Sequence, residues 1–417
     1  MESAGANGVS RVVRSKVVIM GWYGNGNVGD EMILQCMLED LRKVLPNASF
    51  TVISDDPADT SRSHGVRSLA RGGTTVQRVR RAVAIMQSDL FILGGGSLLK
   101  RHGASDSSVL TWLGPLHLAH RMGVRAMTYA IGVSGEWSPS GRELVSRMLG
   151  EADAVCVRDQ ASNEILKGLG FGKGIVTADP AILLGDALPD GVRTPVLGGH
   201  PRISVFLRHW YVYENRILDE PAWKRFEQGL AASLDFLVRE RSAHIAFVPM
   251  RTKTGDDDRI VAQEVAQMMS SKADAETVNG PVTTADVVRI IGESDLVIGM
   301  RLHSLIVAAL SGVASIAIDY DEKVRGFEND LGAGDWVVEM DQGEKQIVNL
   351  AERALAGSYP VKMVENRVAD MKVLARDNAK TAARLLKESG TPGLSVVKAF
   401  RNVGIFLDWI LGGHSSS

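Results

Sequence analysis

The chain has 417 residues, of which 47 are Lys or Arg and 49 are Asp or Glu, so its formal net charge is −2. This balance gives no reason to expect nucleic acid as a partner, because such binding needs an excess of cations. The length exceeds what one hydrophobic core usually serves, so two domains are expected. With 45% hydrophobic residues, the composition is typical of a globular protein.

The two ends of the chain and its cysteines indicate in which cellular compartment the protein is expected. Residues 1–14 form a loose tail without the apolar core of a signal peptide. No run reaches the roughly 18–20 apolar residues of a membrane span, so we predict a cytoplasmic protein. Residues 393–413 predict an apolar helix that docks back on the protein or, alternatively, lies on the inner face of the membrane. Cys36 and Cys156 lie in apolar segments and are predicted to be buried thiols, and nothing indicates a metal or a cofactor.

Short apolar segments alternate with helical ones through the first part of the chain. The predicted strands are 16–20, 49–53, 90–93, 125–131 and 154–157. The predicted helices are 31–45, 75–86, 112–122, 143–149 and 162–170. This alternation predicts a parallel sheet with helices on both faces.

A second series of the same kind follows residues 185–201, which are rich in Gly and Pro and predict a linker. Its predicted strands are 202–207, 243–248, 295–300 and 313–318. Its predicted helices are 222–239, 259–269, 283–291, 304–310, 346–355 and 360–387. We therefore predict an α/β protein with two Rossmann-like domains, 15–190 and 191–375, followed by C-terminal helices over 376–417.

A glycine-rich loop follows the first predicted strand. Residues 24–29 fit the GxGxxG pattern, and Asp55 and Asp56 end the next strand, as in a dinucleotide site. The turn is longer than usual, however, and the acids at the following helix start would repel a pyrophosphate. Amides and carboxylates here suit a polyhydroxylated ligand better. The candidate residues are Asn25, Asn27, Asp30 and Glu31.

A second glycine run, Gly94-Gly95-Gly96, comes directly after the predicted strand 90–93. Glycines at this place would let a ligand approach the backbone, and a simple tight turn is an equally good interpretation.

Arg301 and His303 lie between the predicted strand 295–300 and the predicted helix 304–310. In open α/β sheets, ligands bind where a strand ends and a helix begins. Free N–H groups at a helix start favour an anion there. A guanidinium and an imidazole beside them predict a site for a phosphate or a carboxylate. Three acids at another helix start, 256–258, are interpreted as N-caps rather than metal ligands.

These segments together resemble the polysaccharide pyruvyl transferase family, which includes the enzymes that pyruvylate bacterial cell-wall polymers. The resemblance runs from about Val17 to Gly332 and is most specific over 295–327. The other segments that carry it are 21–34, 94–99, 157–170, 178–184 and 205–208. It implies a glycosyltransferase-B-like fold with a cleft between two Rossmann-like halves. It also implies phosphoenolpyruvate as donor, a saccharide diol as acceptor, and a cyclic pyruvate ketal plus phosphate as products.

The resemblance implies that Arg301 and His303 serve the donor, and that Arg208 corresponds to a further donor arginine. The chemistry agrees, because a donor with a carboxylate and a phosphate calls for several cations. His303 is the natural general acid for protonating the methylene carbon. Lys323 could assist with phosphate, although a solvated lysine is the simpler interpretation.

The N-terminal half should hold the acceptor, and two departures from the family pattern lie there. Lys100 and Arg101 follow the second glycine run where an acid or amide is expected, and residues 132–135 replace a Gly-x-Gly-Pro turn. We expect Gly95 and Gly96 to border the acceptor, and the cationic pair to meet a diphosphate on it. The acceptor sugar and any lipid link stay open.

Other functions remain open as alternatives. A glycosyltransferase of the same architecture would need a carboxylate for a ribose in the C-terminal half, and Asp319 and Glu322 are candidates. A non-catalytic saccharide-binding relative is opposed by the presence of Arg301 and His303. An NAD oxidoreductase rests on the GxGxxG pattern alone.

Overall fold

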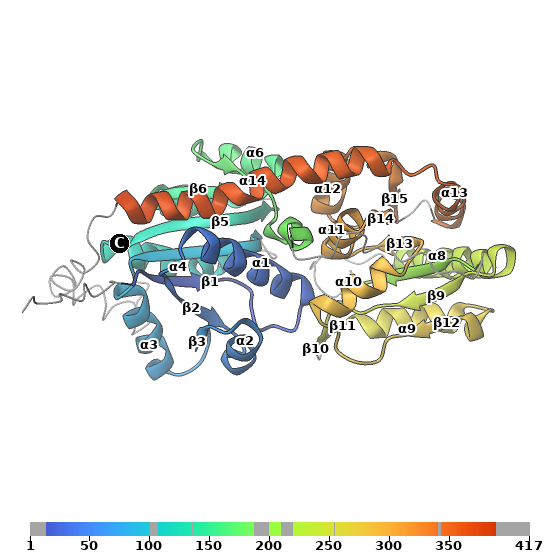
Figure 1. Cartoon of the computed structure of the whole chain (residues 1–417), viewed down its shortest axis with the longest axis horizontal. Coiled ribbons are helices and arrows are strands. Elements are labelled where there is room, and N and C mark those ends of the chain that lie inside the picture. The colour runs from blue at the N-terminus through green and yellow to red at the C-terminus, as the bar shows by residue number, and fades with distance from the viewer. Residues whose placement is uncertain are drawn as a thin grey trace, which may run out of the picture.

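The computed structural model describes residues 14–100, 107–135, 137–186, 200–209, 220–253, 255–340 and 343–388. Within these residues the chain forms two α/β domains that lie end to end, and one long helix runs along both of them (Figure 1). Each domain has a parallel sheet between layers of helices, as the alternating pattern predicts.

The N-terminal domain is built on a seven-stranded parallel sheet in the order β3-β2-β1-β4-β5-β6-β7. The strands are β1 (Lys16–Met20), β2 (Ser49–Ser54), β3 (Arg67–Ala70), β4 (Leu90–Lys100), β5 (Arg125–Ser134), β6 (Ala154–Val157) and β7 (Ile175–Val176). The helices are α1 (Val28–Val44), α2 (Pro57–His64), α3 (Thr75–Met86), α4 (Ser107–Arg121), α5 (Pro139–Gly150), α6 (Gln160–Gly168) and the 3-10 helix η1 (Pro180–Asp186). The order reverses between β1 and β4, which makes their carboxyl ends the ligand-binding crevice of such a sheet.

The C-terminal domain repeats this plan with a six-stranded sheet in the order β12-β9-β8-β13-β14-β15. The strands are β8 (Arg202–Phe206), β9 (His244–Phe247), β12 (Ala275–Thr277), β13 (Leu296–Gly299), β14 (Ala314–Asp319) and β15 (Val337–Glu339), with a small antiparallel pair, β10 (Thr252–Lys253) and β11 (Asp256–Asp257). The helices are α8 (Glu220–Arg241), α9 (Asp258–Met268), α10 (Thr284–Gly292), α11 (Leu302–Leu310), α12 (Glu322–Leu331), α13 (Gly343–Leu355) and the 3-10 helices η2 (Lys272–Asp274) and η3 (Gly334–Trp336). Here the crevice lies between β8 and β13.

Helix α14 (Val361–Glu388) ties the two domains together, and it is the red helix along the top of Figure 1. It packs on α11 and α12 of the C-terminal domain and on α1, η1 and β5 of the N-terminal domain. Small buried residues, Ala375, Ala379 and Ala382, let its second half lie close to the N-terminal domain. The boundary predicted between 375 and 376 therefore falls inside one continuous helix, because this helix serves both domains.

Of the two interpretations of the second glycine run, the tight turn is wrong, because β4 continues beyond the predicted end at residue 93 to Lys100. Gly95 and Gly96 have φ of 56° and 85°, and the register with β5 shifts between Gly96 and Leu99. A Cβ at Gly95 would overlap Ile33 of α1, so glycine is needed for this close approach. The short elements α2, β3, β7, β10, β11, β12, α12 and β15 were not predicted either.

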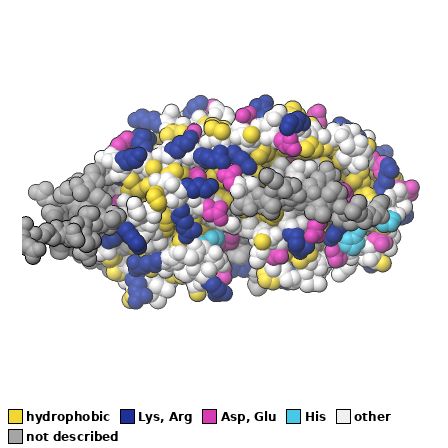
Figure 2. All heavy atoms as spheres, viewed as in Figure 1, with side chains coloured by type: hydrophobic (Ala, Val, Ile, Leu, Met, Phe, Trp, Pro, Cys, Tyr) yellow, Lys and Arg dark blue, Asp and Glu magenta, His cyan; other side chains and the backbone are white. Residues whose placement is uncertain are grey.

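The remaining predictions concern the cysteines, the linker and the two ends of the chain, and the structure describes only some of these residues. Cys36 and Cys156 are buried free thiols, as expected. The N-terminal tail up to residue 13, most of the linker (187–199) and the apolar C-terminal segment lie outside the described residues. None of the described helices is both long and apolar enough to cross a membrane. The face in Figure 2 carries charged side chains over both domains.

A buried glutamate in α12 makes the stability of the fold depend on pH. Glu328 is 0% exposed, and neither of its carboxylate oxygens has a hydrogen-bond partner among the described residues. Burial raises its pKa to about 8. The folded protein therefore holds this proton between the unfolded pKa and about pH 8, and its stability falls as the pH rises through that window.

We expect Glu328→Gln to match the parent near pH 4 and to be more stable at neutral pH, by on the order of 3 kcal/mol. Chemical denaturation at several pH values measures the difference. The exposed Glu240→Gln is the control and should change stability little throughout. Equal stabilities of Glu328→Gln and the parent at all pH values would contradict an uncharged Glu328.

Candidate functional site

The two crevices face each other across a direct contact between the domains. The backbone N–H of Val28 donates to the carbonyl of Met250 at 3.0 Å. Asn27 forms an isolated antiparallel bridge with Arg251. The Asn25 side-chain oxygen accepts from Arg251 at 3.1 Å and from Lys253 at 2.9 Å. The glycine-rich loop is therefore fixed against the C-terminal domain, and the carboxyl ends of both sheets border one cleft.

Of the four polar residues in and after the glycine-rich loop that were predicted for the acceptor, three hold this loop in place. Asn27 caps α1 by accepting from the N–H of Gly29 at 3.2 Å. Glu31 accepts from the N–H of Gly24 at 2.8 Å and lies 3.0 Å from His64. Asn25 is buried and, besides its contacts with the other domain, donates to Asp55 at 3.0 Å.

Asp55, the acid that a dinucleotide site would need, is also engaged. Arg71 donates to both of its carboxylate oxygens, at 2.9 and 2.5 Å. The structure thus gives the NAD interpretation no free carboxylate at this position.

Asp30 differs from its neighbours because its surroundings bring its pKa close to neutral pH, where it can accept or release a proton. Burial, reinforced by the charge of Glu31, raises the pKa of Asp30 to about 7, against the opposing effects of Arg251, the hydrogen bond from Asn27 and Lys323. Lys323 belongs to the other domain, so Asp30 faces the cleft. Gly96 lies beside it, and a Cβ there would be 3.2 Å from Asp30 Oδ1.

His303 lies at the start of α11 and reaches the N-terminal domain. A Cβ on Gly29 of α1 would overlap its ring, so the ring packs against that backbone. Its Nε2 is 3.8 Å from Asp179 Oδ2, and among the described residues neither atom has a hydrogen-bond partner. Burial lowers the pKa of His303 to about 4, and Asp179 opposes this only in part. The imidazole is neutral at pH 7 in the absence of a ligand.

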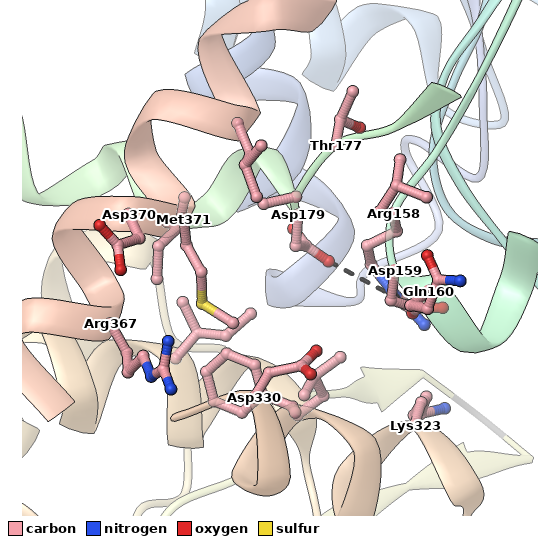
Figure 3. A pocket seen from close by; sticks show the side chains of 17 residues that line it. Arg158, Asp159, Gln160, Thr177, Asp179, Lys323, Asp330, Arg367, Asp370 and Met371 are labelled. Carbon is pink, nitrogen blue, oxygen red and sulfur yellow. Dashed lines mark hydrogen bonds and ion pairs between the residues drawn. The ribbon is translucent and has the colours of Figure 1, made fainter. Parts of the chain in front are cut away.

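Asp179 is held in place from both sides. Its Oδ1 accepts from the N–H of Ala181 at 3.0 Å, and its Oδ2 is 3.8 Å from Arg158 Nη1. Figure 3 shows Arg158 and Asp179 pointing toward each other at the edge of a cavity of about 250 Å³ under α14. The cavity is bordered by both domains, and Lys323 also lines it.

Arg301 is buried and forms an ion pair within its own domain. Its Nε donates to Asp258 Oδ2 at 3.1 Å, and its Nη2 pairs with Asp258 Oδ1 and lies 3.6 Å from Asp256. Among the described residues Nη1 of Arg301 has no such partner, so one edge of the guanidinium is left for a ligand. As predicted, an acid caps the helix start, but it is Asp257 alone. Its two neighbours serve as partners of arginines.

A second group of cations surrounds Tyr320, which follows β14. Arg208 Nη1 donates to the Tyr320 hydroxyl at 3.3 Å, and Lys323 Nζ lies 5.4 Å from the centre of its ring. Lys323 is 3.3 Å from Asp321, so it is not the solvated lysine that the simpler interpretation expected. Lys100, at the end of β4, reaches across the cleft to Asp321 at 3.2 Å.

The charged residues around Arg301 and those around Tyr320 differ in net charge. Arg301 and Arg251 are matched by Asp256 and Asp258, the latter two buried. Around Tyr320 lie three cations, Arg208, Lys323 and Lys100, and among the described residues the carboxylate that pairs with the two lysines is that of Asp321. Asp256 and Asp258 of the first group also act on Arg208, so the five cations of the two groups face three carboxylates. The local excess of positive charge favours an anion at this end of the cleft.

The structure therefore brings together most of the predicted site. His303, Lys100 and Lys323 reach groups of the other domain, and Arg208 and Arg301 follow the carboxyl ends of β8 and β13. Gly96 lies beside Asp30, whereas Gly95 packs on Ile33 and Arg101 lies outside the described residues. Asp179, Arg158, Tyr320 and Asp258 were not predicted as site residues. Asp179, Arg158 and Tyr320 lie in segments that carry the family resemblance, and this was the only signal that could have found these three residues.

The architecture and the cleft define a class: this is a glycosyltransferase-B-like protein with two Rossmann-like domains. The chain belongs to the polysaccharide pyruvyl transferase family, whose model matches residues 27–322. This is a family of transferases, and the match includes both Asp30 and His303.

Solved structures share the fold at low sequence identity. A putative UDP-N-acetylglucosamine 2-epimerase from Listeria monocytogenes aligns with a TM-score of 0.62 and 15% identity, over 91% of this chain and 98% of that one. A glycosyltransferase from Rickettsia africae gives 0.56 and 10%, over 97% and 100%. The UDP-GlcNAc 2-epimerase from Methanocaldococcus jannaschii gives 0.55 and 11%, over 87% and 100%. At these identities the similarity concerns the fold alone.

Proposed function

We propose that the protein transfers pyruvate from phosphoenolpyruvate to two hydroxyls of a saccharide of a cell-surface polysaccharide or its precursor, forming a cyclic ketal and releasing phosphate. The observation that carries this proposal is the positive charge around Tyr320, where Lys323 lies close enough to act on both His303 and Asp30. The donor has two anionic groups on a small frame, and this arrangement matches it with cations on one side and a proton donor on the other. Family membership supports the same reaction.

In this scheme Arg208, Lys323 and the free edge of Arg301 bind the carboxylate and phosphate. His303 gives its proton to the methylene carbon, which becomes a methyl group, and the adjacent carbon becomes electrophilic. A sugar hydroxyl adds to that carbon and loses its proton to Asp30. The second hydroxyl then displaces the phosphate, the bond between that carbon and the phosphate oxygen breaks, and inorganic phosphate leaves with the remaining proton.

The protonation of His303 is coupled to donor binding. Without ligand, burial keeps the imidazole neutral at pH 7. An anionic donor placed against it would favour the charged form, as Asp179 already does in part. Donor binding should therefore take up a proton.

A glycosyltransferase that uses a nucleotide sugar is the second candidate, and the fold of the neighbours favours it. Of the two carboxylates that could bind a ribose, Asp319 pairs with Arg325 at 2.6 Å, and Glu322 is exposed. This occupied carboxylate weakens the second candidate.

The test is ligand-induced stabilisation by phosphoenolpyruvate, UDP-sugars and NAD, compared between the parent protein and Arg208→Gln. We expect phosphoenolpyruvate to raise the melting temperature, since ligand at about 100 times its Kd adds about 2.7 kcal/mol. Arg208→Gln should weaken that binding by about 10- to 100-fold, because it removes a charged hydrogen bond to the donor. Arg239→Gln, an exposed position on α8, is the control and should bind normally.

Phosphate release from phosphoenolpyruvate in the presence of a saccharide then tests the reaction itself. Stabilisation by a UDP-sugar alone, without phosphate release when both ligands are present, would replace pyruvyl transfer by glycosyl transfer. Unchanged phosphoenolpyruvate binding in Arg208→Gln would remove this residue from the donor site.

A further inference from the structure

One edge of the N-terminal domain is strongly basic, in contrast to the nearly neutral chain. Between Thr60 and Gln87 there are six arginines and no aspartate or glutamate, whereas the formal net charge of the whole chain is −2. We call these residues the arginine edge: Arg62, Arg67, Arg71, Arg78, Arg80 and Arg81, on α2, β3, α3 and the connections between them. In Figure 2 dark blue side chains gather at the lower left, where Figure 1 places α2 and α3.

Half of these arginines are engaged in the fold. Arg71 pairs with Asp55, and its guanidinium lies 4.5 Å from the centre of the Trp22 ring. Arg81 Nη1 donates to the carbonyls of Ala70 and Gly72, at 3.0 and 3.2 Å. Arg62 lies 3.7 Å from Asp59, and both side chains are more than half exposed. Such contacts leave most of the positive charge at this edge unneutralised.

The other three, Arg67, Arg78 and Arg80, are exposed and form no ion pair with any of the described residues. The pKa of the half-buried Arg81 is lowered by burial and then by the charges of Arg78 and Arg71, so like charges lie close together at this edge. Like charges this close repel one another and weaken the fold. A surface that keeps them is therefore a candidate binding site for a partner of opposite charge.

Helix α3 adds an apolar group to the same surface. Val76 is 60% exposed, and Arg80 follows it one turn later on the same side of the helix. Thr74 and Gln77 form a capping box, so the helix is well anchored at this end. An exposed valine flanked by arginines suits the boundary between phospholipid headgroups and acyl chains better than it suits a soluble polyanion.

We propose that the arginine edge docks the protein on an anionic phospholipid surface. With Arg71 paired to Asp55 and Arg62 to Asp59, four of the six cations have no carboxylate partner among the described residues, which is the lower end of the four to eight that such surfaces attract. The contact would lie next to the cleft, because Arg71 binds Asp55, which accepts from Asn25 of the glycine-rich loop. The docked protein would therefore hold its N-terminal crevice near membrane-bound molecules. This inference does not depend on the donor or on the reaction.

The experiment is co-sedimentation of the full chain with vesicles of phosphatidylcholine alone or with about 30 mol % phosphatidylglycerol. We expect binding to the anionic vesicles only, and loss of it at high salt. Arg78→Glu/Arg80→Glu should weaken binding by at least about 30-fold, since each of the two cations lost contributes about fivefold at an anionic surface and the new carboxylates add repulsion. Neither residue borders the cleft, and thermal unfolding checks that the variant is folded.

Arg239→Glu/Lys272→Glu is the matched control, with the same change in net charge at exposed positions of the C-terminal domain. It should keep vesicle binding within about threefold of the parent, because screening at physiological salt confines the effect to nearby charges. Equal losses in both variants, or vesicle binding that persists in Arg78→Glu/Arg80→Glu, would overturn the proposal. So would binding to a soluble anionic polysaccharide without binding to anionic vesicles.

Discussion

Replacing His303 by glutamine should lower the rate of ketal formation by about a hundred- to ten-thousand-fold, the usual contribution of a positioned general acid. Glutamine is close in size to the imidazole that packs on Gly29, so the fold should survive. Phosphoenolpyruvate should still bind, because Arg208, Lys323 and Arg301 remain. Phosphate release at saturating donor measures the rate, and ligand-induced stabilisation measures the binding. Normal turnover by His303→Gln would remove His303 as the acid.

The pH dependence gives a sharper check, because the proposed reaction requires His303 to be protonated. The pKa of this residue is about 4 without ligand and should rise when the donor binds. The rate should then fall as the pH rises through the pKa in the donor complex. Donor affinity should grow as the pH falls toward the ligand-free pKa, because binding takes up a proton.

Asp179→Asn tests whether the carboxylate positions and charges the imidazole. It removes the interaction that raises the His303 pKa, so the fall in rate should move to lower pH. Asp370→Asn changes a carboxylate that lines the same cavity on α14, and it should leave the pH profile in place. A uniform loss of rate in Asp179→Asn at every pH would mean that Asp179 acts only on structure.

The fold was largely predictable because buried parallel strands have a strong local signature. The strands β1, β8, β13 and β14 are short apolar runs of the kind that forms buried parallel strands, and the structure confirms them. The continuation of β4 through Gly94–Gly96 was not predictable, because a run of glycines usually indicates a turn. Here glycine is needed because α1 packs so closely on the strand that it leaves no room for a side chain. The path of α14 over both domains depends on tertiary packing that periodicity does not specify.

The location of the site residues was predictable from the sequence, but their hydrogen-bond and ion-pair partners were not. Residues at the ends of β8 and β13 had to face a crevice, and Arg208, Arg301 and His303 do. Which of the polar residues of the glycine-rich loop stay available was decided by contacts across the chain. Asn25 is held by Arg251 and Lys253, far from it in sequence, whereas Asp30 is left facing Lys323. A sequence shows which groups are present and leaves open which of them are already paired.

The proposed function gives Arg301 a role in donor binding beside its structural ion pair, and mutation can separate the two. Its bond to Asp258 is buried, and a buried carboxylate left without its partner costs about 3–5 kcal/mol. We therefore expect Arg301→Gln to lower the free energy of unfolding by about that amount. It should also weaken phosphoenolpyruvate binding, because the free edge of the guanidinium is lost to the donor.

The double variant Arg301→Gln/Asp258→Asn distinguishes these effects. Removing the stranded charge should restore much of the stability, since two neutral amides can hydrogen-bond where one buried charge could not. Donor affinity should stay low, because neither of the two introduced amides can replace a cation.

Denaturation and donor titration of the four proteins in this cycle give the two coupling energies independently. Recovery of both stability and donor affinity in the double variant would mean that Arg301 only positions its domain and that Arg208 and Lys323 bind the donor without it. Recovery of stability alone would place Arg301 in contact with the donor, with Asp258 fixing the orientation of its guanidinium.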